Sequence, residues 1–161
     1  MQGVERRALT VDERFMLEAL KEAGKALDKE EVPVGAVIVH EGKVIARAHN
    51  QNVLLKDPTA HAEMVAITEA ASALQDARLV KADLYVTIEP CTMCAGALVL
   101  ARVKRILFGA RDPKAGACGS VMNIAHHQSL NHRIQVVGGI LEAECRGLLQ
   151  EFFRKKRLKE N

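Results

Sequence analysis

The chain has 161 residues, 48% of them apolar, which fits a single domain large enough to bury a sizeable core. No apolar run approaches the length of a membrane span, and the first residues lack the apolar stretch of a signal peptide, so we expect no membrane contact and a cytoplasmic location. In that compartment the four cysteines stay reduced, and a closely spaced cysteine pair is more typical of a metal site than of a disulfide.

Positive charge is concentrated at the C-terminus. The net charge is only +3, yet residues 146–161 carry six basic and two acidic side chains, whereas residues 1–145 carry 17 basic and 18 acidic ones. This asymmetry favours contact with a nucleic acid or another anionic surface, and a solvated basic helix end is the simpler alternative.

The first predicted elements are a helix and a hairpin. Thr10 and Glu13 form a capping-box pattern, and apolar residues follow at helical spacing, which predicts a helix over about residues 11–27. Residues 34–40 and 43–49 are separated by a short Glu-Gly turn, and their apolar and β-branched side chains predict two antiparallel strands.

The remainder of the chain alternates between helices and strands. After a loop over residues 50–58 we expect, in order, a helix over about 60–74, a strand over 82–88, a helix starting near Pro90 and running to Leu100, a strand over 104–108, a loop over 109–120, a strand over 134–137 and a basic helix over about 141–158. This alternation predicts one α/β domain over residues 1–161, in which a mixed sheet of about five strands is covered by helices on both faces.

Two short motifs carry the chemistry. His61 and Glu63 stand two residues apart, and Cys91 and Cys94 form a C-x-x-C pair. One imidazole and two thiolates supply three ligands for a tetrahedral zinc ion and leave its fourth position open for water. Both cysteines fall at a predicted helix start, where the partial positive charge of the helix end stabilises thiolates. An open metal position beside a carboxylate that need not bind the metal indicates a catalytic site.

The order H-x-E followed by P-C-x-x-C is the signature of zinc-dependent nucleobase deaminases. In this chemistry an activated water adds to the ring carbon that bears an amine, Glu63 carries the protons, and ammonia leaves. On a regular helix His61 and Glu63 would point roughly 200° apart, so we expect the metal at the end of the helix. The structural alternative, a closed zinc site or no metal at all, is weakened by the presence of both motifs.

The other metal-binding residue types have simpler interpretations. Cys118 and Cys145 lie outside the motifs and are expected to be ordinary packing residues. The adjacent His126 and His127 are expected to be loop or surface residues rather than ligands of a second metal.

The segments around the motifs resemble bacterial-type tRNA-specific adenosine deaminases over about residues 15–157. The matching stretches are Glu31–Ala36, Asp57–Glu63, Phe108–Asp112, Asn131–Arg133 and Phe152–Arg154. The resemblance implies a three-layer α/β/α cytidine-deaminase-like fold, one zinc ion per chain, and a homodimer. It also implies a hydrolase acting on the C–N bond of a cyclic amidine, which converts adenosine to inosine at the wobble position of a tRNA anticodon.

The resemblance further implies roles for single residues. The positions that match the zinc ligands are His61, Cys91 and Cys94. Glu63 matches the proton shuttle, Asn50 the amide that holds the target nucleoside, and Ala62 the backbone contact to the base. Five further residues stand on segments that border the anticodon loop, where a polar loop residue without substrate contact is the alternative: Asp112, Lys114, Asn131, His132 and Arg133.

The chain offers few aromatic side chains for RNA. Their content is 3%, with no tryptophan, so there is no stacking platform of the kind that single-strand binders use. We therefore expect a flipped base to be held by aliphatic and polar groups and by Phe153. The last helix should dock by its apolar face and leave four basic residues at its rim to bind phosphates of the anticodon stem-loop: Arg154, Lys155, Lys156 and Arg157.

Two other functions fit the zinc motifs. One is deamination of a free nucleobase such as guanine or cytosine, against which the basic C-terminus argues. The other is a non-catalytic, zinc-containing subunit that binds RNA. Glu63 argues against this third function, because such a subunit has no use for a proton shuttle.

Overall fold

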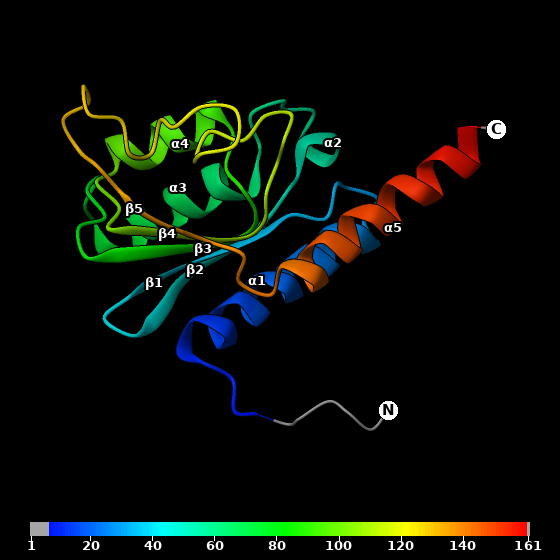
Figure 1. The fold of residues 1–161 in the computed structure, drawn as a ribbon, viewed down its shortest axis with the longest axis horizontal. Helices are drawn as coiled ribbons and strands as arrows, with labels where there is room; N and C mark the ends of the chain where they lie inside the picture. The colour runs from blue at the N-terminus through cyan, green and yellow to red at the C-terminus, as the bar shows by residue number, and fades with distance from the viewer. Residues whose placement is uncertain (1–6, 161) are drawn as a thin grey trace.

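The computed structural model describes residues 7–160 and arranges them in three layers (Figure 1). The middle layer is a five-stranded sheet in the order β2-β1-β3-β4-β5. Its strands are β1 (Gly35–His40), β2 (Lys43–His49), β3 (Ala82–Ile88), β4 (Arg105–Ala110) and β5 (Gln135–Gly138). Strand β1 pairs antiparallel with β2 and β3, whereas β3, β4 and β5 are parallel, which confirms the predicted mixed sheet.

Helices cover both faces of this sheet. Helices α1 (Val11–Asp28) and α5 (Glu142–Glu160) pack on one face, and α3 (Ala62–Leu74) and α4 (Thr92–Leu100) lie on the other (Figure 1). The short helix α2 (Asn52–Leu55) lies in a segment that we expected to be a loop. No helix of residues 7–160 has the length and apolar character that crossing a bilayer requires.

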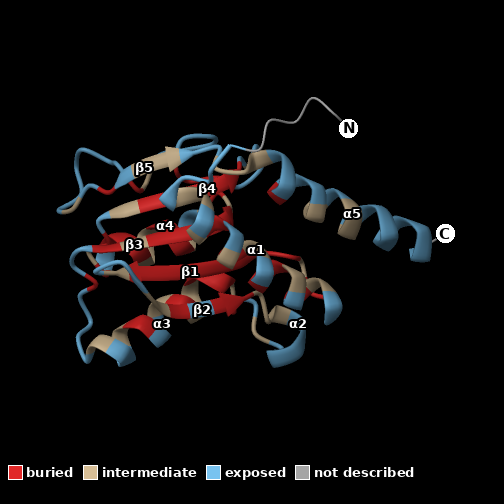
Figure 2. Cartoon of the chain, turned by 90° about the horizontal axis from the view of Figure 1, so that it is seen from below, coloured by how far each residue is buried: buried red, intermediate tan, exposed pale blue. Residues whose placement is uncertain are grey.

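The central strands are apolar on both faces because both faces are covered (Figure 2). On the α3–α4 face Ile38, Leu84 and Ile106 stand side by side, and on the α1–α5 face Val37 is paired with Tyr85. All five side chains are almost completely buried. Two-sided burial explains why these segments appear in the sequence as continuous apolar runs rather than as alternating ones.

Most predicted element boundaries agree with the structure. The capping box of α1 is present, because the Glu13 N–H donates to Thr10 Oγ1 at 3.1 Å and the Thr10 N–H donates to Glu13 Oε1 at 2.9 Å. The largest differences are two residues: α3 begins at Ala62, α5 ends at Glu160, and β4 continues to Ala110, where Ile88 of β3 still pairs with it. The N-terminal segment used for the signal-peptide argument lies almost wholly outside the described residues.

The chain segments that form the site meet at one end of the strands. Because β1 runs opposite to its two neighbours, β2, β3 and β4 all have their C-terminal ends on this side of the sheet. Helices α3 and α4 also begin there, one after the loop that follows β2 and the other directly after β3. The ends of these strands and the starts of these helices therefore face one another, as in other open α/β sheets that bind ligands at strand ends.

Candidate active site

The three predicted metal ligands come together at the C-terminal ends of β2 and β3. The Nδ1 atom of His61 lies 3.6 Å from Cys91 Sγ and 3.5 Å from Cys94 Sγ, and all three ligand atoms lie within 4.8 Å of one another. Tetrahedral zinc, with bonds of about 2.0–2.3 Å to nitrogen and sulfur, places its ligand atoms about 3.5–3.8 Å apart. The donor set therefore fits zinc in both chemistry and spacing. It is the one such group among residues 7–160.

Local backbone structure explains this convergence. His61 is the N-cap of α3 and Cys91 the N-cap of α4, each with an extended backbone and no capping hydrogen bond from its side chain. Their side chains are therefore free to turn toward a shared point between the two helix ends. Because His61 precedes the helix, the rotation of roughly 200° between residues i and i+2 of a helix does not apply to it, and its side chain need not point away from that of Glu63. The two helix N-termini also bring partial positive charge to the thiols.

The two thiols differ in acidity. Hydrogen bonds from the Cys94 thiol and the His61 ring lower the pKa of Cys91 to about 3. The pKa of Cys94 is raised, first by its hydrogen bond to Cys91 and then by burial. Cys91 is thus the more acidic thiol of the pair, and binding of a metal requires both cysteines as thiolates.

Glu63 stands in the first turn of α3, in the same pocket as His61 and Cys91. Its side chain is buried, and burial raises its pKa to about 7. Within the described chain, the donors near its carboxylate are its own backbone N–H and the Cys94 thiol. Its oxygens are outside the group of three mutually close ligand atoms, so a fourth metal position is left open. A carboxyl group with a pKa near neutrality can both accept and release protons.

A cavity of about 490 Å³ opens over these residues. This volume lies within the range of about 300–1,000 Å³ that is usual for small-ligand sites. The cavity has apolar walls that include Val34 and Ile88. Four of the predicted substrate-binding residues line it: Asn50, Asp112, Lys114 and Phe153.

Asn50 and Ala62 are joined directly. The Oδ1 atom of Asn50 accepts the Ala62 N–H at 2.8 Å, and the Asn50 N–H donates to the Val34 carbonyl at 3.1 Å. These bonds fix the side chain at the cavity wall and leave its amide N–H groups as donors for a ligand.

A buried carboxylate that the sequence analysis did not single out organises the loop after β4. Glu89 accepts the backbone N–H groups of Asp112 at 3.1 Å and of Cys118 and Ser120 at 3.0 Å, together with the Ser120 hydroxyl. Burial raises the pKa of Glu89, but these hydrogen bonds outweigh it and hold the pKa below its usual value. The loop approaches so closely that a Cβ on Gly116 would lie 2.4 Å from the carboxylate.

Glu31 has a similar role on the other side of the cavity. Its Oε1 accepts the Val53 N–H at 3.1 Å and its Oε2 accepts the Leu54 N–H at 2.7 Å. Glu31 is also buried, and the two bonds hold α2 against the cavity wall by capping its first turn. The sequence signal was that Glu31 begins one of the matching stretches and that Glu89 directly precedes the P-C-x-x-C motif.

The other predicted contacts behave differently. Asp112 lines the cavity, but its Oδ1 also accepts the backbone N–H groups of Lys114 and Ala115 and so stabilises its own turn. Arg154 is exposed on α5 and does not line the cavity. Cys118 and Cys145 are buried in the two cores, as expected of packing residues.

Asn131, His132 and Arg133 are not brought to the cavity. The ring Nε2 of His132 lies 2.7 Å from the Val103 carbonyl, just before β4, and Arg133 donates to the Gln128 carbonyl at 3.0 Å. The segment therefore lies beside the start of β4, at the end of the strands opposite to the cavity.

The chain matches the model of the MafB19-like deaminase family over residues 11–157. It is 53% identical over 152 residues to a tRNA-specific adenosine deaminase of Bacillus subtilis (strain 168), which covers 94% of each chain. It is also 52% identical over 145 residues to the enzyme of that name from Aquifex aeolicus (strain VF5), over 90% of this chain and 95% of the other. This chain belongs to the family of tRNA-specific adenosine deaminases.

Solved structures agree with this family membership. One, from studies of A-to-I editing by tRNA:A34 deaminases at the wobble position of transfer RNA, superposes with a TM-score of 0.82 at 47% identity, covering 84% of this chain and 99% of the other. A guanine deaminase from Bacillus subtilis superposes with a TM-score of 0.61 at 37% identity, covering 67% of this chain and 69% of the other. The cytidine-deaminase-like fold expected from the sequence is thus confirmed, and the tRNA branch is the more similar one.

Proposed function

We propose that this deaminase converts adenosine to inosine at the wobble position of tRNA anticodons, with water as co-substrate and ammonia as second product. The observation that carries the proposal is a His-Cys-Cys ligand set beside a buried glutamate, in a chain that shares about half its residues with tRNA-specific adenosine deaminases over nearly its full length. It is a hydrolase of C–N bonds and uses one zinc ion per chain.

The ligand set is proposed as His61, Cys91 and Cys94. When bound there, zinc lowers the pKa of a water molecule from about 15.7 towards about 7. Glu63 accepts one proton from the attacking water and passes it to the ring nitrogen, and it then transfers the remaining proton of the added hydroxyl to the leaving amine, which departs as ammonia. Its isolation from strong hydrogen-bond donors supports this role, because several donors would lower the pKa of the carboxyl group and make it a poor proton acceptor.

Residues of the cavity walls bind the substrate. The free amide N–H groups of Asn50 hold the target nucleoside, and the backbone of Ala62 contacts the base. Aliphatic side chains and Phe153, which is partly exposed at the cavity rim, enclose the flipped base. The loop that Glu89 orders brings Asp112 and Lys114 to the same rim.

Incubation of the purified protein with bulk tRNA, followed by sequencing for inosine, tests this function. We expect guanosine to be read at wobble adenosines after wild-type treatment and no such change with the Glu63→Ala variant. Hydrolysis of free guanine or cytosine without tRNA editing would overturn the proposal in favour of a free-base deaminase. Guanine deaminases share this fold at 25–37% identity, which is lower than the 47–53% identity to the tRNA-specific adenosine deaminases.

We also propose a cytoplasmic homodimer built on one deaminase domain per chain, spanning residues 1–161. Leu100 at the end of α4 is 82% exposed, which supports a self-association surface there. Asn131, His132 and Arg133 lie away from the cavity of their own chain, so in a homodimer they act on the substrate of the second protomer. Mixing Glu63→Ala with Arg133→Glu protomers should then restore editing that neither variant supports alone, and failure to restore it would contradict this arrangement.

A further inference from the structure

Two ionisable side chains that the proposed mechanism does not use are buried between α1 and the end of β2. Glu22 of α1 is 4% exposed, and His49, the last residue of β2, is 7% exposed. The Nδ1 atom of His49 lies 3.3 Å from Glu22 Oε1. Lys25 Nζ donates to the other oxygen of Glu22 at 2.6 Å, and Lys29 Nζ lies 3.3 Å from His49 Nε2. These four side chains form one polar network, which we call the α1–β2 network.

The α1–β2 network fixes the orientation of the His49 ring. An ammonium group can only donate hydrogen bonds, so Nε2 of His49 accepts from Lys29, and Nδ1 carries the hydrogen that Glu22 accepts. Burial raises the pKa of Glu22, but the hydrogen bonds from Lys25 and His49 outweigh it and hold that pKa below its usual value. Glu22 is thus a carboxylate with a donor on each oxygen, and the ring is held at both of its nitrogens.

The place of His49 in the strand connects this network to the catalytic cavity. Successive residues of a strand point to opposite faces of the sheet. Ala48 packs in the core on the α3–α4 face, so His49 points toward α1 and Asn50 points back toward α3. The Asn50 N–H donates to the Val34 carbonyl at 3.1 Å, and its Oδ1 accepts the Ala62 N–H at 2.8 Å. The buried ring and the amide proposed to hold the substrate therefore belong to adjacent residues.

Helix α1 is a firm support at this point. A Cβ on Gly35, the residue of β1 that pairs with His49, would lie 2.0 Å from the Ala19 carbonyl oxygen and 2.4 Å from the Ala23 nitrogen. The backbones of α1 and β1 are therefore in contact, and the helix cannot move closer to the sheet. Strand β2 is the edge strand, so its end has a strand neighbour on one side and takes a second restraint from the link to α1.

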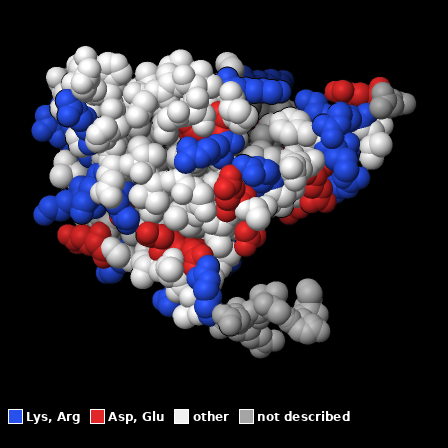
Figure 3. Space-filling view, viewed as in Figure 1, with Lys and Arg blue, Asp and Glu red and all other residues white. Residues whose placement is uncertain are grey.

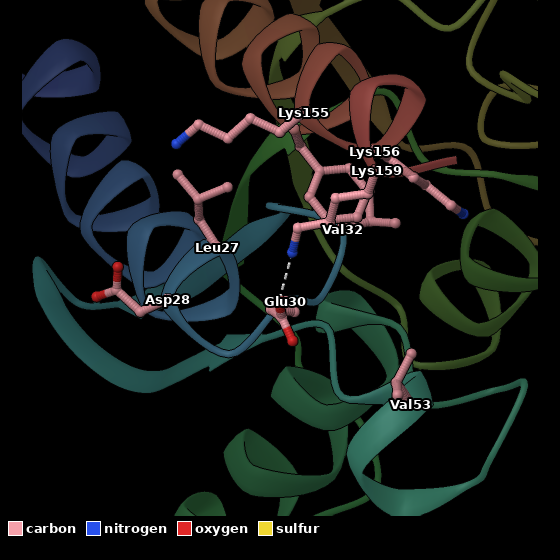
Figure 4. A pocket seen from close by; sticks show the side chains of 9 residues that line it. Leu27, Asp28, Glu30, Val32, Val53, Lys155, Lys156 and Lys159 are labelled. Carbon is pink, nitrogen blue, oxygen red and sulfur yellow. Dashed lines mark hydrogen bonds and ion pairs between the residues drawn. The ribbon is translucent and has the colours of Figure 1, made fainter. Parts of the chain in front are cut away.

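Two other charged links from α1 and the residue pair that follows it lie nearer the surface. Glu18 pairs with Arg47 of β2, and both side chains are partly exposed. Exposed Lys and Arg side chains gather at the end of α5 (Figure 3), and Lys159 among them pairs with Glu30 (Figure 4), with 72% and 77% of the two side chains exposed. Exposed ion pairs contribute little to stability. The α1–β2 network is the buried one of these three links, so its geometry is the most tightly fixed.

Stability alone does not account for a buried polar pair at this place. Apolar side chains of similar size would fill the same space without the cost of removing charged and polar groups from water. A hydrogen bond adds direction, which the packing of apolar side chains does not. Because hydrogen bonds hold both nitrogens of its ring, His49 fixes the end of β2 along the strand direction as well as at its distance from α1.

We propose that Glu22 and His49 are positioning residues for Asn50, which keep its side-chain amide at the place where the target nucleoside binds. This inference rests on the proposed function, because that function assigns Asn50 to the nucleoside. Neither Glu22 nor His49 lines the catalytic cavity, so both act through Asn50 rather than on the substrate. The same side chain holds the first N–H of α3, the helix that carries Glu63, and so joins the network to the proton shuttle.

Editing at saturating tRNA tests this proposal. Glu22→Ala removes the acceptor of the His49 ring, and we expect the single-turnover rate of the zinc-loaded protein to fall by about tenfold or more, since a small misplacement can cost up to about a hundredfold. Kd for tRNA should stay within about twofold, because phosphate contacts outside the cavity dominate affinity. Glu22→Gln keeps an acceptor oxygen and should retain most of the rate. An unchanged rate in Glu22→Ala, with only a lower unfolding midpoint, would show a merely structural role and overturn the proposal.

The chain offers a matched control for this variant. Glu18→Ala removes the surface link between the same helix and the same strand, and should change neither the rate nor Kd. Losses of equal size in Glu18→Ala and Glu22→Ala would contradict a special role of the buried pair. His49→Phe keeps a ring of similar size and loses both hydrogen bonds, and it takes the place of Glu22→Ala if that variant does not fold.

A second substitution shows whether the effect passes through Asn50. In an Asn50→Ala background, Glu22→Ala should cause less than about a twofold further loss of rate, because the group that it positions is already absent. If Glu22→Ala costs as much in this background as in the wild type, the two sites act independently and the inference is wrong.

Hydrogen exchange measures the position of Asn50 without any substrate. Ala62 is the first residue of α3, so its N–H has no partner within the helix, and its protection reports the bond to Asn50 Oδ1. We expect this amide to exchange at least about tenfold faster in Glu22→Ala and at the wild-type rate in Glu18→Ala. Unchanged exchange in Glu22→Ala would overturn the inference and leave the activity standing. If wild-type protein edits no tRNA, the proposed function has failed, whereas the exchange result still decides whether Glu22 and His49 position Asn50.

Discussion

Glu63 and Glu89 both line the catalytic cavity and are both almost completely buried, yet the surroundings of their carboxyl groups differ. At Glu63 burial dominates, the pKa rises to about 7, and the nearby donors are few. At Glu89 three backbone amides and a hydroxyl converge on the carboxylate and hold its pKa below the usual value. Burial alone therefore does not decide what a glutamate does. The number of donors separates a group that exchanges protons from one that serves as a fixed acceptor.

The largest expected effect comes from removing one of the proposed metal ligands. Cys91→Ala should lose zinc, editing activity and stability together, because the ion joins the starts of α3 and α4. Elemental analysis and thermal unfolding measure this directly. Full zinc occupancy in the variant would show that Cys91 is not a ligand.

Glu63→Ala should abolish proton transfer without removing the metal. We expect editing to fall by at least about 10²–10⁴-fold, the usual contribution of a general acid–base group, since one residue handles several transfers here. Zinc content and the unfolding midpoint should stay close to those of the wild type. Single-turnover editing assays on tRNA provide the measurement, and near-normal turnover would assign the proton transfers to another group.

Glu89→Gln should affect loop order rather than chemistry. The new amide places N–H donors where three backbone N–H groups already point, and each unsatisfied buried group costs about 1–3 kcal/mol. We expect a lower unfolding midpoint and a raised KM for tRNA, with kcat changing less than in Glu63→Ala. Ser120→Ala removes a single donor and is the matched milder control. A Glu89→Gln protein with wild-type stability and KM would remove the distinction drawn between the two glutamates.

Glu31→Gln is the smallest expected change. Only two backbone N–H groups, those of Val53 and Leu54, depend on this carboxylate, and α2 is a short helix at the surface. The loss should be about 1 kcal/mol in the free energy of unfolding, with faster hydrogen exchange confined to α2. Urea denaturation combined with hydrogen exchange measures both, and exchange that spreads into the sheet would contradict a purely local role.

Sequence patterns predicted the layers and the ligand set because both depend on residue type at short spacing. The distance of three between Cys91 and Cys94, and the capping pattern of α1, are local properties. The anchoring by Glu31 and Glu89 was not predicted, because their partners are backbone amides 22 to 31 residues further along the chain. Every residue except proline carries such an amide, so the partner leaves no mark in the sequence.

Short-range sequence patterns also could not predict where the anticodon-bordering residues lie in the fold. Asp112 and His132 lie near the two ends of one long connection between β4 and β5, yet they are found at opposite ends of the strands. Whether a loop segment lies at the N-terminal or the C-terminal ends of the strands depends on where the parallel strands begin and end. Likewise, the ion pair between Lys159 and Glu30 joins residues 129 positions apart and could not be foreseen from the basic run alone.

The way Glu89 grips its loop has a consequence for how the substrate range of this fold can change. Since the carboxylate accepts main-chain N–H groups, these anchoring bonds need no particular side chain at the residues that donate them, provided that none of these residues is proline. Gly116 is fixed by lack of space, and Ala117 and Cys118 are fixed by their burial in the core. The backbone of the loop is thus held in place while its exposed side chains can vary. Libraries that vary these exposed positions and keep Glu89 and Gly116 are a direct route to altered nucleobase specificity.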